Sequence, residues 1–219
     1  MATDLDMTLT DTQVRKWGRA RVGISDYGAA GITVPTAASG LFDGASFKPK
    51  AWPAGVKELG YVTTDGFTAG RSISTSDTTM LQSKVPVRSD VESITHTIKF
   101  ALGEANNFVN ALYHGQAVST FGANKDAAWL YSDDETSGAY ENEYVLWLVF
   151  VDGSGSRAVY REEIGYRVKI TAIDDRSMKR TDAEVYGFTF GAYSDSISGK
   201  SITRGQDGPG LTTHLTYTP

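Results

Sequence analysis

The sequence predicts a mainly β protein that contains one α-helix and forms a single domain over residues 1–219. Several segments alternate apolar and polar residues with a period of two, whereas only one segment repeats apolar residues with the helical period of 3.6. A chain of 219 residues with 40% hydrophobic residues is long enough to bury one sizeable core. Neither an internal repeat nor a change in composition divides it into two domains.

The first 53 residues contain one predicted strand between two irregular segments. Residues 1–17 are polar up to Trp17 and are expected to form an N-terminal arm. Residues 18–25 alternate apolar and polar side chains, which predicts a strand. Residues 26–53 are rich in Gly, Ala, Ser and Pro and predict a long loop. Three large aromatic residues in this loop argue against plain disorder and for a contact that the loop must make.

The middle of the chain predicts a hairpin, a long strand and the helix. Residues 57–63 and 67–76 flank an Asp65-Gly66 pair, which favours a tight turn because glycine adopts positive φ. Residues 91–101 alternate over their whole length and predict an amphipathic strand. Residues 103–114 repeat apolar side chains at helical spacing, and Gly115 is placed to end the helix.

The last third predicts four strands and a polar C-terminal tail. Residues 144–151 are apolar on both faces, which is typical of a central strand. After a turn at residues 152–156, strands are predicted at 157–163, 166–173 and 184–191. The tail, residues 194–219, is polar and rich in Gly.

Charge and composition exclude several classes of protein. A formal net charge of −5 argues against binding nucleic acid through its phosphates. No apolar run approaches the roughly 20 residues that span a bilayer, and the N-terminus lacks a basic region, so a soluble protein without membrane insertion is expected. The absence of Cys removes disulfides, thiolate metal sites and thiol nucleophiles.

The sequence contains partial matches to catalytic and cofactor-binding motifs, but the neighbouring residues do not fit any of them. Residues 153–158 fit a relaxed dinucleotide-binding pattern, but a period-two segment follows where a helix is required, so a hairpin turn is predicted. Residues 199–201 resemble the end of a phosphate-binding loop but lack its first Gly. The three His residues have no companions at metal-ligand spacing. We therefore expect no enzyme activity, no cofactor and no metal.

A pattern of structural residues runs from Trp52 to Gly115. Residues 52–68 read W-P-x-x-x-x-E-L-G-Y-V-T-T-D-G-F-T, residues 81–88 read L-Q-S-K-V-P-V-R, and residues 95–115 read T-H-T-I-K-F-A-L-G-E-A-N-N-F-V-N-A-L-Y-H-G. In this order the segments resemble the major tail tube protein of bacteriophages with long, non-contractile tails. The resemblance covers about a third of the chain and carries no catalytic signature.

The resemblance implies a fold, an assembly and a location. The fold would be a β-sandwich or distorted barrel with one flanking helix. Six copies would form a ring, and rings would stack into a tail tube through which genome DNA leaves without specific binding. The tape measure and tube-terminating proteins would be further partners. The protein would be made in the host cytoplasm and reside in the virion.

Two sets of residues are candidates for functional contacts in such a tube. The aromatic residues of the long loop, Tyr27, Phe42, Phe47 and Trp52, are expected to contact the adjacent ring, the alternative being a loop that folds back over its own domain. Six subunits would carry 6 × (−5) = −30 charges. Acidic side chains at the lumen would keep phosphates from sticking, and Glu58, Asp65 and Asp77 are the candidates.

The same composition also permits a carbohydrate- or receptor-binding β-sandwich. Aromatics make up 11% of the chain, and a lectin would use exposed ones such as Trp129 or Tyr131. Glycan binding that depends on these side chains would distinguish this alternative from a tube protein.

Overall fold

One antiparallel sheet organises the part of the chain that the computed structural model describes, residues 14–35, 37–132 and 141–217. This confirms the mainly β prediction. The strands follow the order β2-β1-β5-β6-β7-β4-β3, with β8 also paired to β6, and the sheet does not close on itself. Their bounds are β1 Arg19–Asp26, β2 Lys57–Glu58, β3 Val62–Thr78, β4 Arg88–Leu102, β5 Tyr144–Asp152, β6 Val159–Ile173, β7 Tyr186–Tyr193 and β8 Ile202–Asp207.

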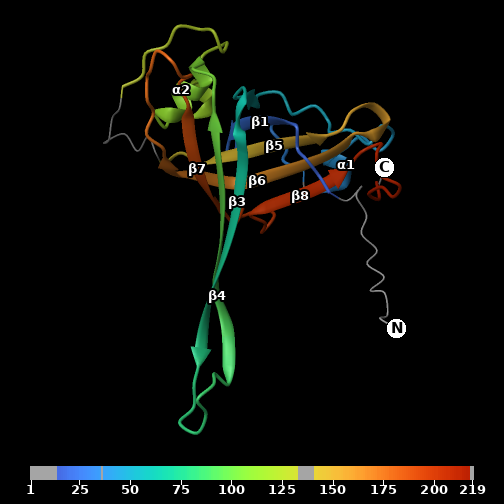
Figure 1. The fold of residues 1–219 in the computed structure, drawn as a ribbon, viewed down its shortest axis with the longest axis vertical. Helices are drawn as coiled ribbons and strands as arrows, with labels where there is room; N and C mark the ends of the chain where they lie inside the picture. Colours follow the sequence, from blue (N-terminus) through green and yellow to red (C-terminus); the bar gives the residue numbers. More distant parts are fainter. Residues whose placement is uncertain (1–13, 36, 133–140, 218–219) are drawn as a thin grey trace, which may run out of the picture.

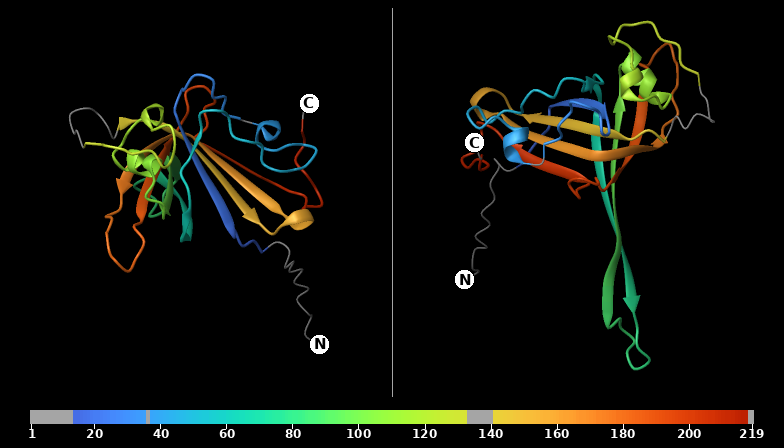
Figure 2. Two further views of the ribbon diagram at one scale, coloured as in Figure 1. Left: turned by 90° about the horizontal axis from the view of Figure 1, so that it is seen from above. Right: turned by 180° about the vertical axis from the view of Figure 1, so that it is seen from behind.

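The sheet changes direction along β6. Residues 160–165 of β6 pair with β8, whereas residues 167–173 pair with β7 on the same edge. Because β7 in turn carries β4 and β3, these three strands run across the direction of β1, β5, β6 and β8 (Figures 1 and 2). The folded-over sheet encloses a core on its inner face, which fits the expected sandwich or distorted barrel.

The central strand β5 contributes to two cores. Its even-numbered side chains, from Tyr144 to Phe150, belong to the inner cluster, while Val145 and Trp147 belong to an outer cluster. This alternation confirms the prediction that residues 144–151 are buried on both faces. The inner cluster is rich in aromatics, and the rings of Phe100 and Phe190 stack with their centroids 5.6 Å apart.

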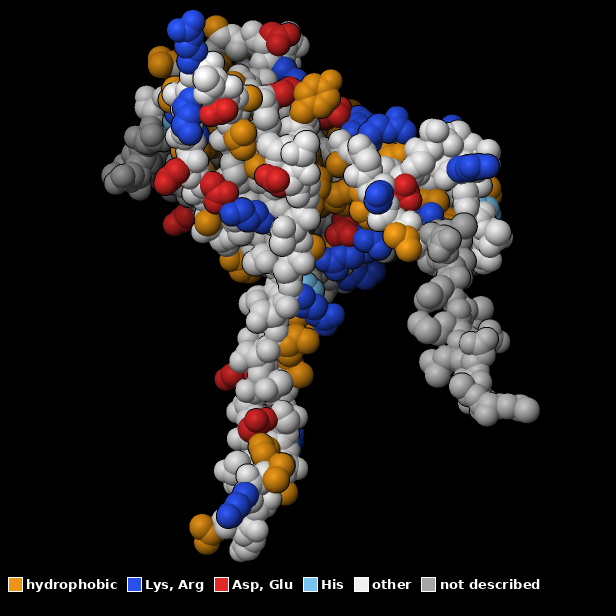
Figure 3. Space-filling view, viewed as in Figure 1, with side chains coloured by type: hydrophobic (Ala, Val, Ile, Leu, Met, Phe, Trp, Pro, Cys, Tyr) orange, Lys and Arg blue, Asp and Glu red, His pale blue; other side chains and the backbone are white. Residues whose placement is uncertain are grey.

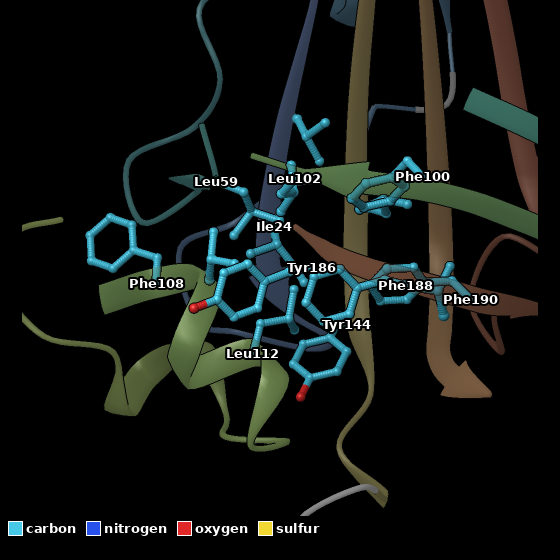
Figure 4. Close-up of a cluster of buried hydrophobic side chains, with 14 of the residues drawn as sticks. Ile24, Leu59, Phe100, Leu102, Phe108, Leu112, Tyr144, Tyr186, Phe188 and Phe190 are labelled. Carbon is cyan, nitrogen blue, oxygen red and sulfur yellow. The ribbon is translucent and has the colours of Figure 1, made fainter. Parts of the chain in front are cut away.

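Helix α2, Asn107–Tyr113, covers one end of the inner core. In Figure 4 its side chain Leu112 lies between Tyr186 and Tyr144, whereas Phe108 lies at the margin of the cluster. The helix starts where the side chain of Asn106 accepts a hydrogen bond of 3.0 Å from the backbone N–H of Val109. It ends at Gly115, as predicted, with φ at +65°. The helix is shorter than the predicted range 103–114 because residues 103–106 are not helical.

The prediction of a hairpin turn at Asp65-Gly66 is wrong. Both residues lie within strand β3, which pairs with β4 before and after them. Gly66 does adopt positive φ, but in a wide bulge where residues 63–66 lie opposite the single residue Ala101. An Asp-Gly pair supplies the same backbone conformation to a bulge as to a turn, so the local signal could not distinguish them.

Two further boundaries differ from the prediction. Residues 157–163 and 166–173 are not separate strands but parts of β6. The segment from Ser194, expected to be a polar tail, contributes β8 to the sheet. Strand β8 was missed because its sequence, ITRGQD, lacks an apolar alternation strong enough to predict it. The turn predicted at residues 152–156 is confirmed, with Gly153 and Gly155 at positive φ.

Candidate assembly surface

The distal parts of β3 and β4 form a hairpin that projects far beyond the body of the molecule (Figure 1). Strand β7 pairs with β4 only from His96 onward, so residues 88–95 of β4 pair with β3 alone. An isolated two-stranded hairpin is at best marginally stable in water. The projecting segment is therefore an element that a partner could complete.

One face of this hairpin continues the apolar face of the inner core into solvent. On β4, Ile98 and Phe100 are buried in the core, whereas Ile94 is 47% exposed. Ile73 on β3 pairs with Ile94 and is 51% exposed. A register shift after Ser74 leaves Val91 on the same face, opposite Thr75. Figure 3 shows hydrophobic side chains along one side of the hairpin. Contiguous exposed apolar surface of this kind marks interaction sites.

The tip of the hairpin, residues 79–87, is held in shape by its own hydrogen bonds. The Ser83 hydroxyl donates to the Val85 carbonyl at 2.8 Å, and the Val87 N–H donates to the Thr78 carbonyl at 2.9 Å. The ordered tip presents Leu81, which is 100% exposed, together with Met80 and Val85.

The sheet also ends in unpaired edges. β3 forms the last strand at one end of the sheet order, and the two-residue β2 forms the other end. A long exposed edge such as that of β3 presents free backbone N–H and C=O groups to which another chain can pair. Among the described strands, these edges are the natural places for a second copy to extend the sheet.

Unlike the hairpin, the loop at residues 26–53 packs against its own chain. Short helix α1, Ala38–Leu41, leads into Phe42, which is 0% exposed and lies in the outer cluster with Trp147 and Tyr166. Trp52 stacks under the guanidinium of Arg21, 4.6 Å from the ring centroid. Within the described residues, both side chains therefore contact other residues of their own domain.

The other two predicted contact residues anchor the ends of this loop. The hydroxyl of Tyr27 donates a 2.7 Å hydrogen bond to Asp195, and Arg167 lies over its ring. Phe47 stacks on His214 with centroids 3.6 Å apart, and it adopts φ of +57°, which is rare for a residue with a side chain. An inter-ring role for the four aromatics stays a prediction.

The C-terminal segment that carries His214 is tied down by a buried carboxylate. Asp207 accepts hydrogen bonds from the His214 ring, the Tyr217 hydroxyl and the backbone N–H groups of Gly208 and Leu215. Burial opposes the ionisation of Asp207, but the hydrogen bonds from Tyr217 and His214 outweigh it, so its pKa is lowered. Through Phe47, this cluster also fixes the long loop.

The candidate lumen acids lie on different elements. Glu58 on β2 accepts two hydrogen bonds of 3.0 Å from Arg21, and this pairing lowers its pKa. Its charge is therefore balanced within the chain. Asp65 lies in the β3 bulge and Asp77 on the projecting hairpin, and both are exposed. The structure does not bring the three acids into one cluster along the strands.

Aromatic residues beside α2 bear on the carbohydrate-binding alternative. The rings of Trp129 and Tyr131 stack at 5.5 Å, and Trp129 is 44% exposed. Tyr131 is tied to the helix, because its hydroxyl donates a 2.5 Å hydrogen bond to Asn107. This contact gives Tyr131 a structural role and leaves Trp129 as the exposed aromatic of the pair.

Two further kinds of feature are missing from the part of the chain that the structure describes. It contains no group of three or more His, Asp or Glu side chains placed to hold a metal ion. None of its helices is long and apolar enough to cross a membrane. What stands out instead is the projecting apolar hairpin.

The sequence matches the family model described as phage tail tube protein over residues 7–201. The chain belongs to the phage tail tube protein family. Tail tube proteins are structural components of the virion, and an exposed projecting hairpin suits a subunit of an assembly. The match confirms the tail tube protein indicated by residues 52–115 of the sequence, whereas the long, non-contractile type of tail stays a prediction.

Among solved structures, the chain is similar to one from the cryo-EM structure of the anti-feeding prophage (AFP) baseplate, 6-fold symmetrised. The identity is 9%, the TM-score is 0.38, and the alignment covers 85% of this chain and 91% of that chain. No curated protein matches the sequence.

Proposed function

We propose that this tail tube protein forms six-membered rings that stack into the tube of a long, non-contractile phage tail, and that genome DNA leaves through the lumen. Membership of the tail tube family supports the proposal most directly. The described residues add a physical reason for assembly, because Ile73, Val91 and Ile94 extend a core face into solvent. Burying such surface contributes roughly 25 cal/mol for each Å² that leaves water.

In this proposal residues 1–219 form one tail tube domain whose role is structural and not enzymatic. The tape measure and tube-terminating proteins are its further partners, and synthesis takes place in the host cytoplasm before incorporation into the virion. The N-terminal arm, residues 1–17, is proposed to contact a neighbour, although residues 1–13 lie outside the described part of the chain.

The experiment compares the two faces of the hairpin. In the variant Ile73→Asp/Ile94→Asp, charges replace the apolar pair on the exposed face, and we expect a folded monomer that forms no rings or tubes by electron microscopy. The matched control, Ser72→Asp/Thr95→Asp, places the same two charges on the opposite face, where Ser72 also pairs with Thr95. The proposal fails if wild-type protein stays monomeric at high concentration or if both variants assemble equally well.

The proposed lumen is acidic enough to let DNA slide. Asp65 and Asp77 carry this role, since Glu58 is paired with Arg21. Assembled tubes should then bind duplex DNA no better than about 10⁻⁴ M at physiological salt, the weak end of non-specific binding. Micromolar, salt-sensitive binding would contradict an acidic lumen and indicate a basic one.

The exposed ring of Trp129 is the one observation that favours a second candidate, a carbohydrate- or receptor-binding module. In that case a glycan array should show binding that the Trp129→Ala variant loses. We expect no such binding, and we expect Trp129→Ala to form rings like the wild type.

A further inference from the structure

A buried carboxylate without a partner lies beneath the long loop. Glu162 is on β6, and its residue is only 2% exposed. Its Oε2 atom is buried and has no hydrogen-bond partner. Burial raises the pKa of Glu162 to about 8. An unsatisfied buried carboxyl is costly, so a chain that keeps one has an unmet need for a donor or a cation at this place.

Glu162 forms part of the wall of a cavity of about 270 Å³. The cavity has two indole rings and two prolines among its lining, which consists of Thr33, Pro35, Gly40, Lys50, Ala51, Trp52, Pro53, Trp147 and Glu162. A carboxylate together with tryptophan side chains in one cavity wall is a combination that can bind an ammonium or guanidinium group. The site therefore fits the end of a Lys or Arg side chain.

The nearby cations of the chain are engaged elsewhere. Lys50 donates a 2.6 Å hydrogen bond to the carbonyl of Ser39, on the loop itself. Arg21, two strands away from Glu162 in register, pairs with Glu58 and stacks on Trp52. Neither forms an ion pair with Glu162 in the described structure. These two cations of the chain are therefore both engaged with other groups.

The hairpin tip carries a further cation. Lys84 is exposed and, within the described residues, makes no ion pair or side-chain hydrogen bond. It lies between the exposed side chains of Leu81 and Val85. Figure 3 shows basic and hydrophobic side chains together at the end of the hairpin. An apolar tip with one lysine complements an apolar cavity with one carboxylate.

The two features also lie on different sides of the molecule. The hairpin extends downward from the body in Figure 1, whereas the loop that roofs the cavity lies on the body, behind β1, β5 and β6 in that view (Figure 2). The tip of one chain therefore cannot reach the cavity of the same chain, and only the tip of another copy could enter it.

We propose that Lys84 of one copy enters the cavity beneath residues 32–53 of a copy in the adjacent ring and pairs there with Glu162, while Leu81 and Val85 pack against the loop. The inference rests on the proposed stacking of rings and names the contact that joins them. It assigns the loop the role of the receiving surface. The loop takes part in stacking without leaving its own domain, and the projecting hairpin provides the reach.

Disulfide trapping tests the contact directly, because the chain contains no native cysteine. Thr33 is exposed at the cavity, and Gln82 is exposed at the tip beside Lys84. The variant Thr33→Cys/Gln82→Cys keeps Lys84, so it should form covalent multimers when assembled tubes are oxidised and stay monomeric when oxidised before assembly. In the matched control, Thr33→Cys/Thr75→Cys, the second cysteine is on the hairpin stem, and no multimers are expected.

A charge reversal tests the proposed pair. Lys84→Glu and Glu162→Lys should each raise the concentration needed for assembly by about tenfold or more, and the double variant should recover most of the loss. Arg88→Glu is the control, because Arg88 pairs with Asp90 on the stem. If Glu162→Lys does not fold, Glu162→Gln in a folded monomer should still raise the assembly concentration.

The outcomes separate this contact from the function on which it rests. Tubes that form normally with Lys84→Glu, or that give no disulfide with Thr33→Cys/Gln82→Cys, overturn the contact and leave the tube function standing. Equal trapping in the stem control also overturns it. If the wild type forms neither rings nor tubes, both the function and the contact are wrong.

Discussion

The two halves of β4 have the same alternating sequence but opposite environments. In the half next to β7, Ile98 and Phe100 are at most 2% exposed and pack into the inner core. In the projecting half, Ile94 and Val91 lie on the same face but in solvent. Alternation thus specifies which face of a strand is apolar, whereas burial requires a second layer to cover that face. The apolar face of the projecting half of β4 could therefore be buried by another copy of the chain.

The largest expected effect concerns the covered half. Phe100→Ala removes a ring that packs against Phe67, Phe188 and Phe190, and the rigid surroundings leave a cavity. We expect the free energy of unfolding to fall by about 3–5 kcal/mol. Chemical denaturation of the monomer measures this. A loss below about 1 kcal/mol would mean that the inner core is not the main source of stability.

The second effect concerns Glu162, which is buried on β6 beneath the long loop, and the pH dependence of the free energy of unfolding. The pKa of Glu162 is about 8 in the folded chain and near 4.5 ordinarily, so the folded state holds its proton more tightly. The protonated Glu162 therefore contributes to the stability of the folded chain. This contribution is complete below about pH 4.5 and is lost as the pH rises to about 8. Wild-type monomer should lose roughly 3 kcal/mol from this group between pH 5 and pH 8, and Glu162→Gln should not.

The control for this titration is Glu163→Gln on the same strand. Glu163 pairs with Arg204 at 2.9 Å, so this variant measures the cost of the same substitution at a glutamate of β6 that has a partner. Identical pH profiles for wild type and Glu162→Gln would show that Glu162 is not buried as a neutral acid.

A smaller effect is expected at the helix that covers the inner core. Asn106→Ala removes the cap at Val109 and the hydrogen bond to the Leu59 carbonyl. We expect a loss of about 1–2 kcal/mol in unfolding free energy, without a change in fold by circular dichroism. Asn124→Ala, in the loop after the helix, provides a comparison in which no capping side chain is lost. Equal losses in the two variants would exclude a capping role.

The smallest effect on stability belongs to the uncovered half. Ile94→Ser changes an exposed side chain, so the unfolding free energy of the monomer should change by less than about 0.5 kcal/mol. Assembly should nevertheless weaken, which sedimentation measures against Thr95→Ser on the opposite face. A large loss of monomer stability would show that Ile94 already packs within the chain.

Several features could be predicted from the sequence because they depend on neighbouring residues alone. The alternation of residues 18–25 and 91–101 predicts strands, and the apolar run at 144–151 predicts a strand buried on both faces. Gly115 ends the helix because glycine adopts positive φ without steric cost. The pattern from Trp52 to Gly115 also indicated the family that the match over residues 7–201 confirms.

Only the tertiary structure decided which of the predicted strands and loops are buried against the rest of the chain and which are exposed to solvent. Phe42 reads as an aromatic in a Gly-rich loop, yet it is buried because Gly205 on β8 leaves room for its ring. Asp65-Gly66 favours a turn, but pairing of β3 with the whole of β4 makes it a bulge. Burial and strand pairing depend on residues distant in sequence, so no local pattern fixes them. The projecting hairpin, and the carboxylate of Glu162 without a partner, emerge only from that long-range arrangement.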